Sequence, residues 1–286
     1  MQEPVGAELF IIGNEILIGD IRDTNTHWLC GEINRLGGRV GRVTVLPDDT
    51  ETIAVELKRA LARGPALVLT SGGLGPTVDD LTLAAVAAAA GVELRLDAEA
   101  LRMVRERYDE LAAAGVLAEG GLNPAREKMA WLPAGGAPLE NRTGTAPGVL
   151  LRCGRSAIVS LPGVPEELKG IFAGSLQPLL RQTFPRGVSV LRAFTVASND
   201  ESVMEPVLTA VVRNHPRVYL KSLARPLGGG RKIDVILTAA GEERGHLTAL
   251  IDAACRDLQA GLALLGIGCR ERDEAGSPAQ PQDSAR

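Results

Sequence analysis

A glycine-rich segment at residues 71–82 carries the clearest chemical pattern of the chain. Its glycines permit positive φ angles and let backbone N–H groups approach an anion closely. A helix that follows directly adds free N–H groups and the positive end of its dipole. This pattern predicts that a phosphate or diphosphate binds at Ser71, Gly72, Gly73, Leu74, Gly75, Pro76 and Thr77.

The acidic end of this segment has two interpretations. Asp79 and Asp80 can cap the following helix, because Thr77 and Asp80 have the spacing of a capping box. Asp80 can also hold a divalent cation beside a bound phosphate, and the two roles are compatible. The segment has neither the lysine of a Walker A loop nor the spacing of a dinucleotide fingerprint.

Other polar segments follow further predicted strands. Asp48 either caps a helix or faces the glycine loop, and Asn25 either caps a helix or contacts the ligand. A carboxylate just past a buried strand, as at Glu15, is either exposed to solvent or part of a functional site. The additional candidate binding residues are Gly13, Asn14, Glu15, Asn25, Thr145, Pro162 and Gly163. The candidate catalytic residues are Asp80 and Asp48, and the candidate metal ligands are Asp80, Asp48 and Glu15.

Alternating strands and helices would position these residues. Apolar runs at 9–12, 40–46 and 66–70 predict buried strands, each followed by a helical pattern, the third at 79–90. This order is typical of a parallel sheet covered on both faces, whose ligands bind beyond the carboxyl ends of the strands. Three separate segments are therefore expected to meet at one edge of the sheet.

The rest of the chain predicts two more regions. The fold class is α/β, a doubly wound and mostly parallel sheet at 1–184, with a second, smaller α+β domain of β-α-β-β-α order at 188–266. A disordered tail is expected at 269–286. Further expected elements are helices at 97–114 and 165–184, strands at 129–132, 149–152 and 156–161, and a hairpin turn at 228–232.

Composition excludes several classes of protein. The 286 residues are 45% hydrophobic and 23% charged with a net charge of −4, which argues against a sequence-independent nucleic-acid binder. No apolar run is long enough to span a membrane, and no signal peptide is evident, so we expect a cytoplasmic protein. The four cysteines and three histidines show no metal-ligand spacing.

Taken together, these motifs resemble the competence/damage-inducible protein A (CinA) family. The similarity covers about residues 7–184 and matches the molybdopterin-binding-like N-terminal domain of that family, related to the MoaB and MogA proteins. Eukaryotic FAD synthases contain similar strings. The matching segments are Gly13–Leu17, Asp23–Asn25, Pro47–Asp49, Ser71–Thr82, Gly144–Gly148 and Leu161–Pro165.

The resemblance implies a metal-dependent pyrophosphatase acting on ADP-ribose or a related dinucleotide such as FAD, with Mg, Mn or Co as the divalent metal. Asp80 and Asp48 match the aspartates of the two family motifs. The alternatives are a molybdopterin-binding protein of molybdenum-cofactor biosynthesis and a non-catalytic nucleotide-binding module. We expect a nucleotide-like small-molecule substrate and a homo-oligomer, a dimer or trimer. The family's deamidase domain would follow this region, so the resemblance predicts no deamidase activity here.

Overall fold

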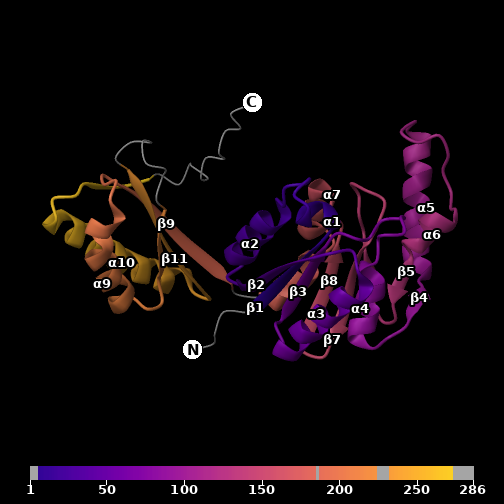
Figure 1. Cartoon of the computed structure of the whole chain (residues 1–286), viewed down its shortest axis with the longest axis horizontal. Coiled ribbons are helices and arrows are strands. Elements are labelled where there is room, and N and C mark those ends of the chain that lie inside the picture. Colours follow the sequence, from indigo (N-terminus) through magenta and orange to yellow (C-terminus); the bar gives the residue numbers. More distant parts are fainter. Residues whose placement is uncertain (1–5, 185–186, 224–231, 273–286) are drawn as a thin grey trace. The chain divides into compact units, whose positions relative to one another are not determined.

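A computed structural model of the chain describes residues 6–184, 187–223 and 232–272 (Figure 1). The chain divides into two compact units, residues 1–185 and 186–286, and each is described by itself. The first unit is α/β with a mixed, mostly parallel central sheet, and the second has a smaller sheet of its own. The predicted fold class is therefore confirmed.

The central sheet of the first unit has six strands in the order β2-β1-β3-β8-β7-β6. The first four strands in this order are mutually parallel, whereas β7 is antiparallel to both of its neighbours. The chain passes from β1 outward to β2 and then returns to the other side of β1 to form β3. The six strands are β1 (Gly6–Ile12), β2 (Arg39–Leu46), β3 (Leu67–Ser71), β6 (Ala137–Leu139), β7 (Gly148–Cys153) and β8 (Ser156–Leu161).

Helices cover both faces of this sheet because its central strands are apolar on both sides. One buried cluster joins β1, β3 and β8 to α2 (Asn25–Arg35), α7 (Pro165–Ala173) and α8 (Gln177–Thr183). The opposite cluster joins the sheet to α3 (Thr50–Arg63) and α4 (Thr82–Ala90). Alternate residues of β1 show this division, since Leu9 belongs to the first cluster and Phe10 to the second.

A third cluster packs against one end of the sheet. It combines Leu74 of the glycine-rich segment with Val104 of α5 and with Met129. The elements around it are β4 (Leu94–Leu96), α5 (Ala98–Ala113), α6 (Pro124–Lys128) and β5 (Trp131–Pro133), and β4 pairs with β5 in a separate two-stranded sheet.

Several predicted boundaries of the first unit are wrong. The helix expected at 79–90 begins at Thr82, because residues 77–80 form a turn that Asp80 closes with side-chain bonds. The helix expected at 165–184 is interrupted at residues 174–176, where Gly174 leaves the helical conformation. The short elements β4, β6, α6 and α1 (Asn14–Leu17) were not predicted, since three to five residues carry little periodicity.

The second unit is a four-stranded antiparallel sheet in the order β10-β11-β9-β12. Two helices bury one apolar cluster against it, with Phe194, Val235 and Leu258 at its centre. The elements are β9 (Val188–Val196), α9 (Glu201–Asn214), β10 (Tyr219–Leu223), β11 (Ile233–Gly241), α10 (Arg244–Leu264) and β12 (Cys269–Glu271).

The predicted tail starts too early, because Cys269–Glu271 is a strand paired with β9. Its isolated length of three residues gave no strand signal. Most of the expected hairpin turn at 228–232, and the tail from 273 onward, lie outside the described residues. Within the described chain, every helix is too short or too polar to cross a bilayer.

Candidate functional site

The carboxyl ends of four parallel strands form the candidate site. We call this edge the rim and define it as residues 13–15, 47–48, 71–80 and 162–163, which follow β1, β2, β3 and β8. The chain reverses its direction of travel across the sheet between β1 and β3, so the loops after these strands diverge there. In open α/β sheets this switch point is where ligands bind.

Reciprocal hydrogen bonds join the loops after β1 and β2. The Asn14 backbone N–H donates to Asp48 Oδ2 at 2.8 Å, and the Asp48 N–H donates to Asn14 Oδ1 at 3.4 Å. Asp49 caps α3 by accepting the Thr52 N–H at 2.8 Å. Capping by Asp48 is therefore wrong, and the half-buried Asp48 side chain lies against the β1 loop. Bonds from the hydroxyl and backbone N–H of Thr52 hold the pKa of Asp49 below its usual range.

Asn25 joins the loops after β3 and β8. Its Nδ2 donates to Ser71 Oγ at 3.0 Å and to the Gly163 carbonyl at 2.8 Å. Ser71 Oγ in turn donates to the Pro162 carbonyl at 3.3 Å. The Asn25 side chain is buried at 6% exposure, and its Oδ1 has no hydrogen-bond partner among the described residues. Asn25 is thus a buried crosslink between two rim loops from its place at the start of α2.

The backbone of the glycine-rich loop needs glycine at two adjacent positions. Gly72 has φ +107° and Gly73 has φ +69°, both in the region that residues with a Cβ rarely adopt. A Cβ at Gly72 would lie 2.1 Å from the Ile12 carbonyl oxygen, so the β1 and β3 loops touch here without a side chain between them. Thr82 fixes the turn, since its hydroxyl donates to the Gly72 carbonyl at 2.7 Å.

The carboxylate of Asp80 closes the second half of this loop. Asp80 Oδ2 accepts the Thr77 backbone N–H at 2.8 Å and the Thr77 hydroxyl at 2.6 Å. The same hydroxyl contacts Asp79 Oδ1, and this bond lowers the pKa of Asp79. Gly75 leaves room for Asp80, because a Cβ there would lie 2.7 Å from Asp80 Oδ2. Capping of α4 by Asp80 is therefore wrong, because the N-cap of α4 is Leu81 and it makes no side-chain capping bond. Asp80 instead closes the turn before the helix.

Three consecutive amides of the loop lack an internal acceptor. No group in the described parts of the chain accepts a hydrogen bond from the backbone N–H groups of Gly73, Leu74 and Gly75. Successive backbone N–H groups in a turn with positive φ form a concave anion-binding surface. The free N–H groups of the first turn of α4 begin directly after the loop and add the positive end of its dipole.

The remaining predicted rim residues lie close by. Glu15 is exposed in α1, and its carboxylate folds back toward Gly13, where a Cβ would lie 2.3 Å from Glu15 Oε1. Pro76 and Thr77 are exposed on the loop after β3. Gly163 approaches Gly72, since a Cβ on Gly163 would lie 3.5 Å from the Gly72 Cα.

The predicted metal ligands do not form a complete set of protein ligands. Within the described residues, no group of three or more His, Cys, Asp or Glu side chains could hold a metal ion. Asp48 and Asp80 each use Oδ2 in a loop hydrogen bond, which leaves the other carboxylate oxygen for a ligand. A divalent ion here would need phosphate oxygens and water to complete its coordination, as Mg²⁺ often does.

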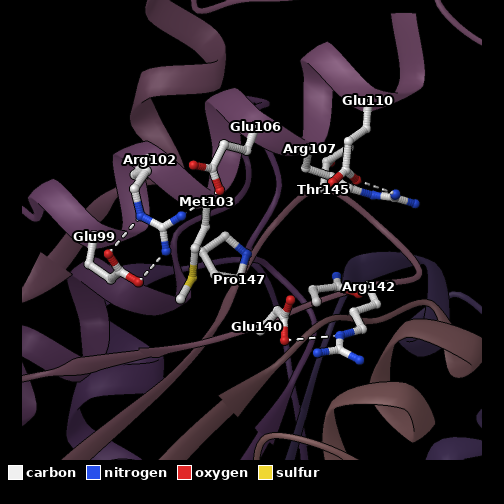
Figure 2. A pocket seen from close by; sticks show the side chains of 11 residues that line it. Glu99, Arg102, Met103, Glu106, Arg107, Glu110, Glu140, Arg142, Thr145 and Pro147 are labelled. Atoms are coloured by element: carbon white, nitrogen blue, oxygen red, sulfur yellow. Dashed lines mark hydrogen bonds and ion pairs between the residues drawn. The ribbon is translucent and has the colours of Figure 1, made fainter. Parts of the chain in front are cut away.

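Thr145 lies in a different place from the other predicted residues. It lines an open groove of about 550 Å³ between α5 and residues 140–147 (Figure 2). None of the described hydrogen bonds that join the rim loops involves Thr145. The groove connects to α7 through Asn141, whose Nδ2 donates to Glu167 Oε2 at 2.7 Å.

Lys128 is a residue that the sequence did not single out. Its ammonium group on α6 donates to the carbonyls of Asp80 at 2.8 Å, Gly75 at 3.5 Å, and Thr77. It comes from a segment about fifty residues further along the chain, and no local motif marks it. Only the packing of α6 beside the loop reveals this contact.

Comparison with known proteins identifies the family. The model described as "Probable molybdopterin binding domain" matches residues 8–182, which is more than half of the chain. The chain belongs to this molybdopterin-binding domain family. A protein of Aeropyrum pernix is 39% identical over 279 residues, covering 96% of this chain and 99% of the relative. A protein of Thermococcus kodakarensis is 36% identical over 248 residues, covering 86% and 94%.

A solved structure supports the CinA resemblance. The CinA protein of Thermoplasma acidophilum is 35% identical, has a TM-score of 0.55, and covers 61% of this chain and 98% of its own. The resemblance expected from the sequence motifs is thereby confirmed. The relative from Aeropyrum pernix thus matches both units of this chain, whereas the CinA structure matches about three fifths of it.

Proposed function

We propose that the rim binds the phosphate or diphosphate of a small molecule of the molybdopterin or nucleotide class. The observation that carries this proposal is the row of unpaired amides at Gly73, Leu74 and Gly75, placed at the switch point of the sheet. An anion there would accept charge-assisted hydrogen bonds from groups already held in position. The family's description supports the same ligand chemistry.

The electrostatics of the rim support an anionic ligand over a neutral one. The first turn of α4 and the free amides direct positive partial charge to the loop surface. Lys128 places a full positive charge on the carbonyl side of the same loop. Asp48 and Asp80 lie at the edges of the rim, and one carboxylate oxygen of each accepts a hydrogen bond from a loop N–H group. A phosphate bound at the centre of the loop would therefore face N–H donors.

Cleavage of a phosphoanhydride is the candidate reaction. Its support is the placement of two half-buried carboxylates, Asp48 and Asp80, at the loops on either side of β1. A divalent ion, Mg, Mn or Co, held by Asp80 with Asp48 or Glu15 would offset charge on the diphosphate. The loop amides would bind one phosphate and keep it still while water attacks the other. ADP-ribose, or a related dinucleotide such as FAD, would then release AMP.

Molybdopterin binding without hydrolysis is the second candidate. It is favoured by the match to the molybdopterin-binding domain family. Molybdopterin carries a phosphate, which the same amides would bind. The two candidates differ in their products, because one hydrolyses ADP-ribose to AMP and a second phosphate product, and the other transfers AMP from ATP to molybdopterin with release of pyrophosphate.

The test measures binding and turnover separately. Calorimetric titration with inorganic pyrophosphate, AMP and ADP-ribose reports binding, and AMP release is followed with Mg²⁺, Mn²⁺ and Co²⁺. Asp80→Asn keeps the shape of the side chain, so we expect it to keep the fold and to abolish AMP release. Unchanged release would remove Asp80 from the reaction, and binding without release under all three metals would leave the molybdopterin role. No binding of any of these phosphates would refute the proposed site.

The expected homo-oligomer and the cytoplasmic location are separate proposals. Light scattering of the purified chain tests the first, and a monomer at micromolar concentration would contradict it. Cell fractionation tests the second.

A further inference from the structure

Lys128 is the only described cation that contacts the carbonyl side of the glycine-rich loop. Its ammonium group donates to the Asp80 carbonyl at 2.8 Å, to the Gly75 carbonyl at 3.5 Å, and to the Thr77 carbonyl. These are three acceptors for the three donors of an ammonium group. The lysine therefore binds the loop backbone along residues 75–80 and not a single carboxylate.

The position of Lys128 is determined by its surroundings. Asn123 caps α6 by accepting the Arg126 N–H at 2.9 Å, and the Arg126 guanidinium stacks on the Tyr108 ring of α5 at 4.0 Å. The next residue, Met129, is 2% exposed and belongs to the same buried cluster as Leu74 of the loop. The loop and the lysine are thus anchored on one shared apolar cluster.

Binding of these carbonyls has a consequence for the amides of the loop. In a trans peptide the C=O and N–H groups point in opposite directions. The carbonyl of Thr77 shares a peptide plane with the Val78 N–H, and the carbonyl of Asp80 shares one with the Leu81 N–H. With both carbonyls turned to Lys128, these N–H groups point away from it, and neither has an acceptor among the described residues.

We propose that Lys128 is a positioning residue of the phosphate site: its ammonium group orients the second half of the loop so that the Val78 and Leu81 N–H groups face the ligand and extend the row of amides at Gly73–Gly75. It also supplies the fixed positive charge that the loop itself lacks, since no lysine follows the glycines as in a Walker A loop. Lys128 acts through the loop and does not touch the phosphate. The inference rests on the proposed phosphate binding at this rim.

The experiment removes the charge of Lys128 while keeping a side chain of similar length. Inorganic pyrophosphate is titrated into the wild-type protein, Lys128→Met, Lys128→Ala and the control Lys58→Met, which removes an exposed lysine of α3. We expect Lys128→Met to weaken pyrophosphate binding by roughly tenfold or more, because the loop backbone loses the charge-assisted hydrogen bonds that hold its orientation. Lys58→Met should stay within about twofold of wild type.

Chemical rescue separates positioning from general stability. Lys128→Ala leaves a space that n-propylammonium fills with the same carbon chain and ammonium group. We expect millimolar propylammonium to restore most of the lost affinity of Lys128→Ala and to leave Lys128→Met unchanged, because methionine fills the space. Thermal unfolding of each variant shows whether the fold is intact.

The outcomes distinguish the inference from the proposed function. Wild-type affinity in a folded Lys128→Met overturns the role of Lys128 and leaves phosphate binding standing. If Lys128→Met fails to fold, Lys128→Ala with and without propylammonium decides, and no gain in affinity on rescue overturns the inference. Gly73→Ala, whose Cβ would lie 2.3 Å from Thr82 Oγ1, should abolish pyrophosphate binding in any case. Binding that survives Gly73→Ala and is lost in Lys128→Met would move the phosphate site off the loop and refute the proposed function instead.

Discussion

The rim and the groove beside α5 belong to the same unit, but they differ in whether their polar groups are already paired. The groove has an open volume of about 550 Å³ and a high density of charge, yet its arginines are already paired (Figure 2). Arg102 binds Glu99 and Glu106, Arg142 binds Glu140, and Arg107 binds Glu110. The rim has fewer charges, but its amides at Gly73–Gly75 lack acceptors within the described chain.

On the proposed assignment, the phosphate site lies on the surface with unpaired donors and not on the surface with the most charge. A phosphate gains most from donors that are held in place and not yet paired, because it breaks no existing bond when it binds. In the groove each arginine would first have to leave a carboxylate. The predictions below test this contrast, beginning with the largest expected effect.

Gly72→Ala should damage the rim most. The new Cβ would lie 2.1 Å from the Ile12 carbonyl oxygen, in a residue with φ +107°. We expect a loss of roughly 2–4 kcal/mol in the free energy of unfolding, from backbone strain and overpacking together. Binding of pyrophosphate should fall below detection. Denaturant unfolding and calorimetry measure the two effects, and Gly31→Ala in α2, where a Cβ meets nothing within 4 Å, is the matched control.

Asn25→Ala should have an intermediate effect, because it removes the crosslink between Ser71 and Gly163. Losing both hydrogen bonds, one of them to the buried Ser71 hydroxyl, should cost about 1–3 kcal/mol in unfolding free energy. Pyrophosphate affinity should fall less than in Gly72→Ala, since the amides keep their local conformation. Asn214→Ala, at the exposed end of α9, serves as the control. An Asn25→Ala protein with wild-type stability would show that the two loops are held together by other contacts.

Acidification should reduce the stabilising contributions of Asp79 in the rim and of Glu99 in the groove in the same way. The pKa of Asp79 is lowered by the Thr77 hydroxyl, and the pKa of Glu99 is lowered by Arg102. A lowered folded-state pKa means that each carboxylate stabilises the fold above its unfolded pKa and loses this contribution as pH falls through the lower folded value. The difference in melting temperature between wild type and Asp79→Asn, or Glu99→Gln, should therefore shrink as the pH falls below about 4.

High salt provides the second half of this test. An Arg–Glu pair on the surface is screened by ions, whereas a hydrogen bond from a hydroxyl is screened less. At 1 M salt the screening length is about 3 Å. At neutral pH, the difference in melting temperature caused by Glu99→Gln should then largely vanish, and the difference caused by Asp79→Asn should persist. Equal salt sensitivity of the two would contradict the contrast between the regions.

Arg102→Met in the groove should have the smallest effect. Its side chain is half exposed and shared between two exposed glutamates, so its ion pairs are weak in water. We expect pyrophosphate affinity and AMP release to stay at wild-type levels, measured by the same titration and assay. A large loss of affinity would place the phosphate site in the groove and reverse the comparison.

Many of the elements around the site could be predicted from local patterns. The alternation of apolar runs and helical periodicity in residues 9–90 places β1, α2, β2, α3 and β3 within a few residues of their observed bounds. Glycine at positions 72 and 73 also permits the positive φ angles that are observed there. The start of α4 was placed three residues early, because Asp79 and Asp80 read as helix starters although Asp80 closes a turn before the helix.

The interactions across the rim could not be predicted in the same way. Asp48 and Asp49 are identical side chains in adjacent positions, and only the direction of the backbone gives the cap to Asp49 and turns Asp48 toward Asn14. Thr145 lies in a loop that contains glycine, proline and hydroxyl residues, as the glycine-rich rim loop does, yet it lines the groove. Lys128 belongs to a helix of five residues with no motif of its own.

The order of the amino acids by itself determined the parallel α/β architecture of the first unit, the glycine loop and the acidic residues after the strands. Hydrophobic periodicity and the steric freedom of glycine are local properties, and they act over a few residues. The tertiary structure alone decided that Asn25 ties two loops together, that Arg102 and Arg107 of α5 are paired with glutamates, and that Lys128 holds the loop from about fifty residues away. Such contacts depend on how separate elements pack, and the local sequence contains no pattern that indicates them.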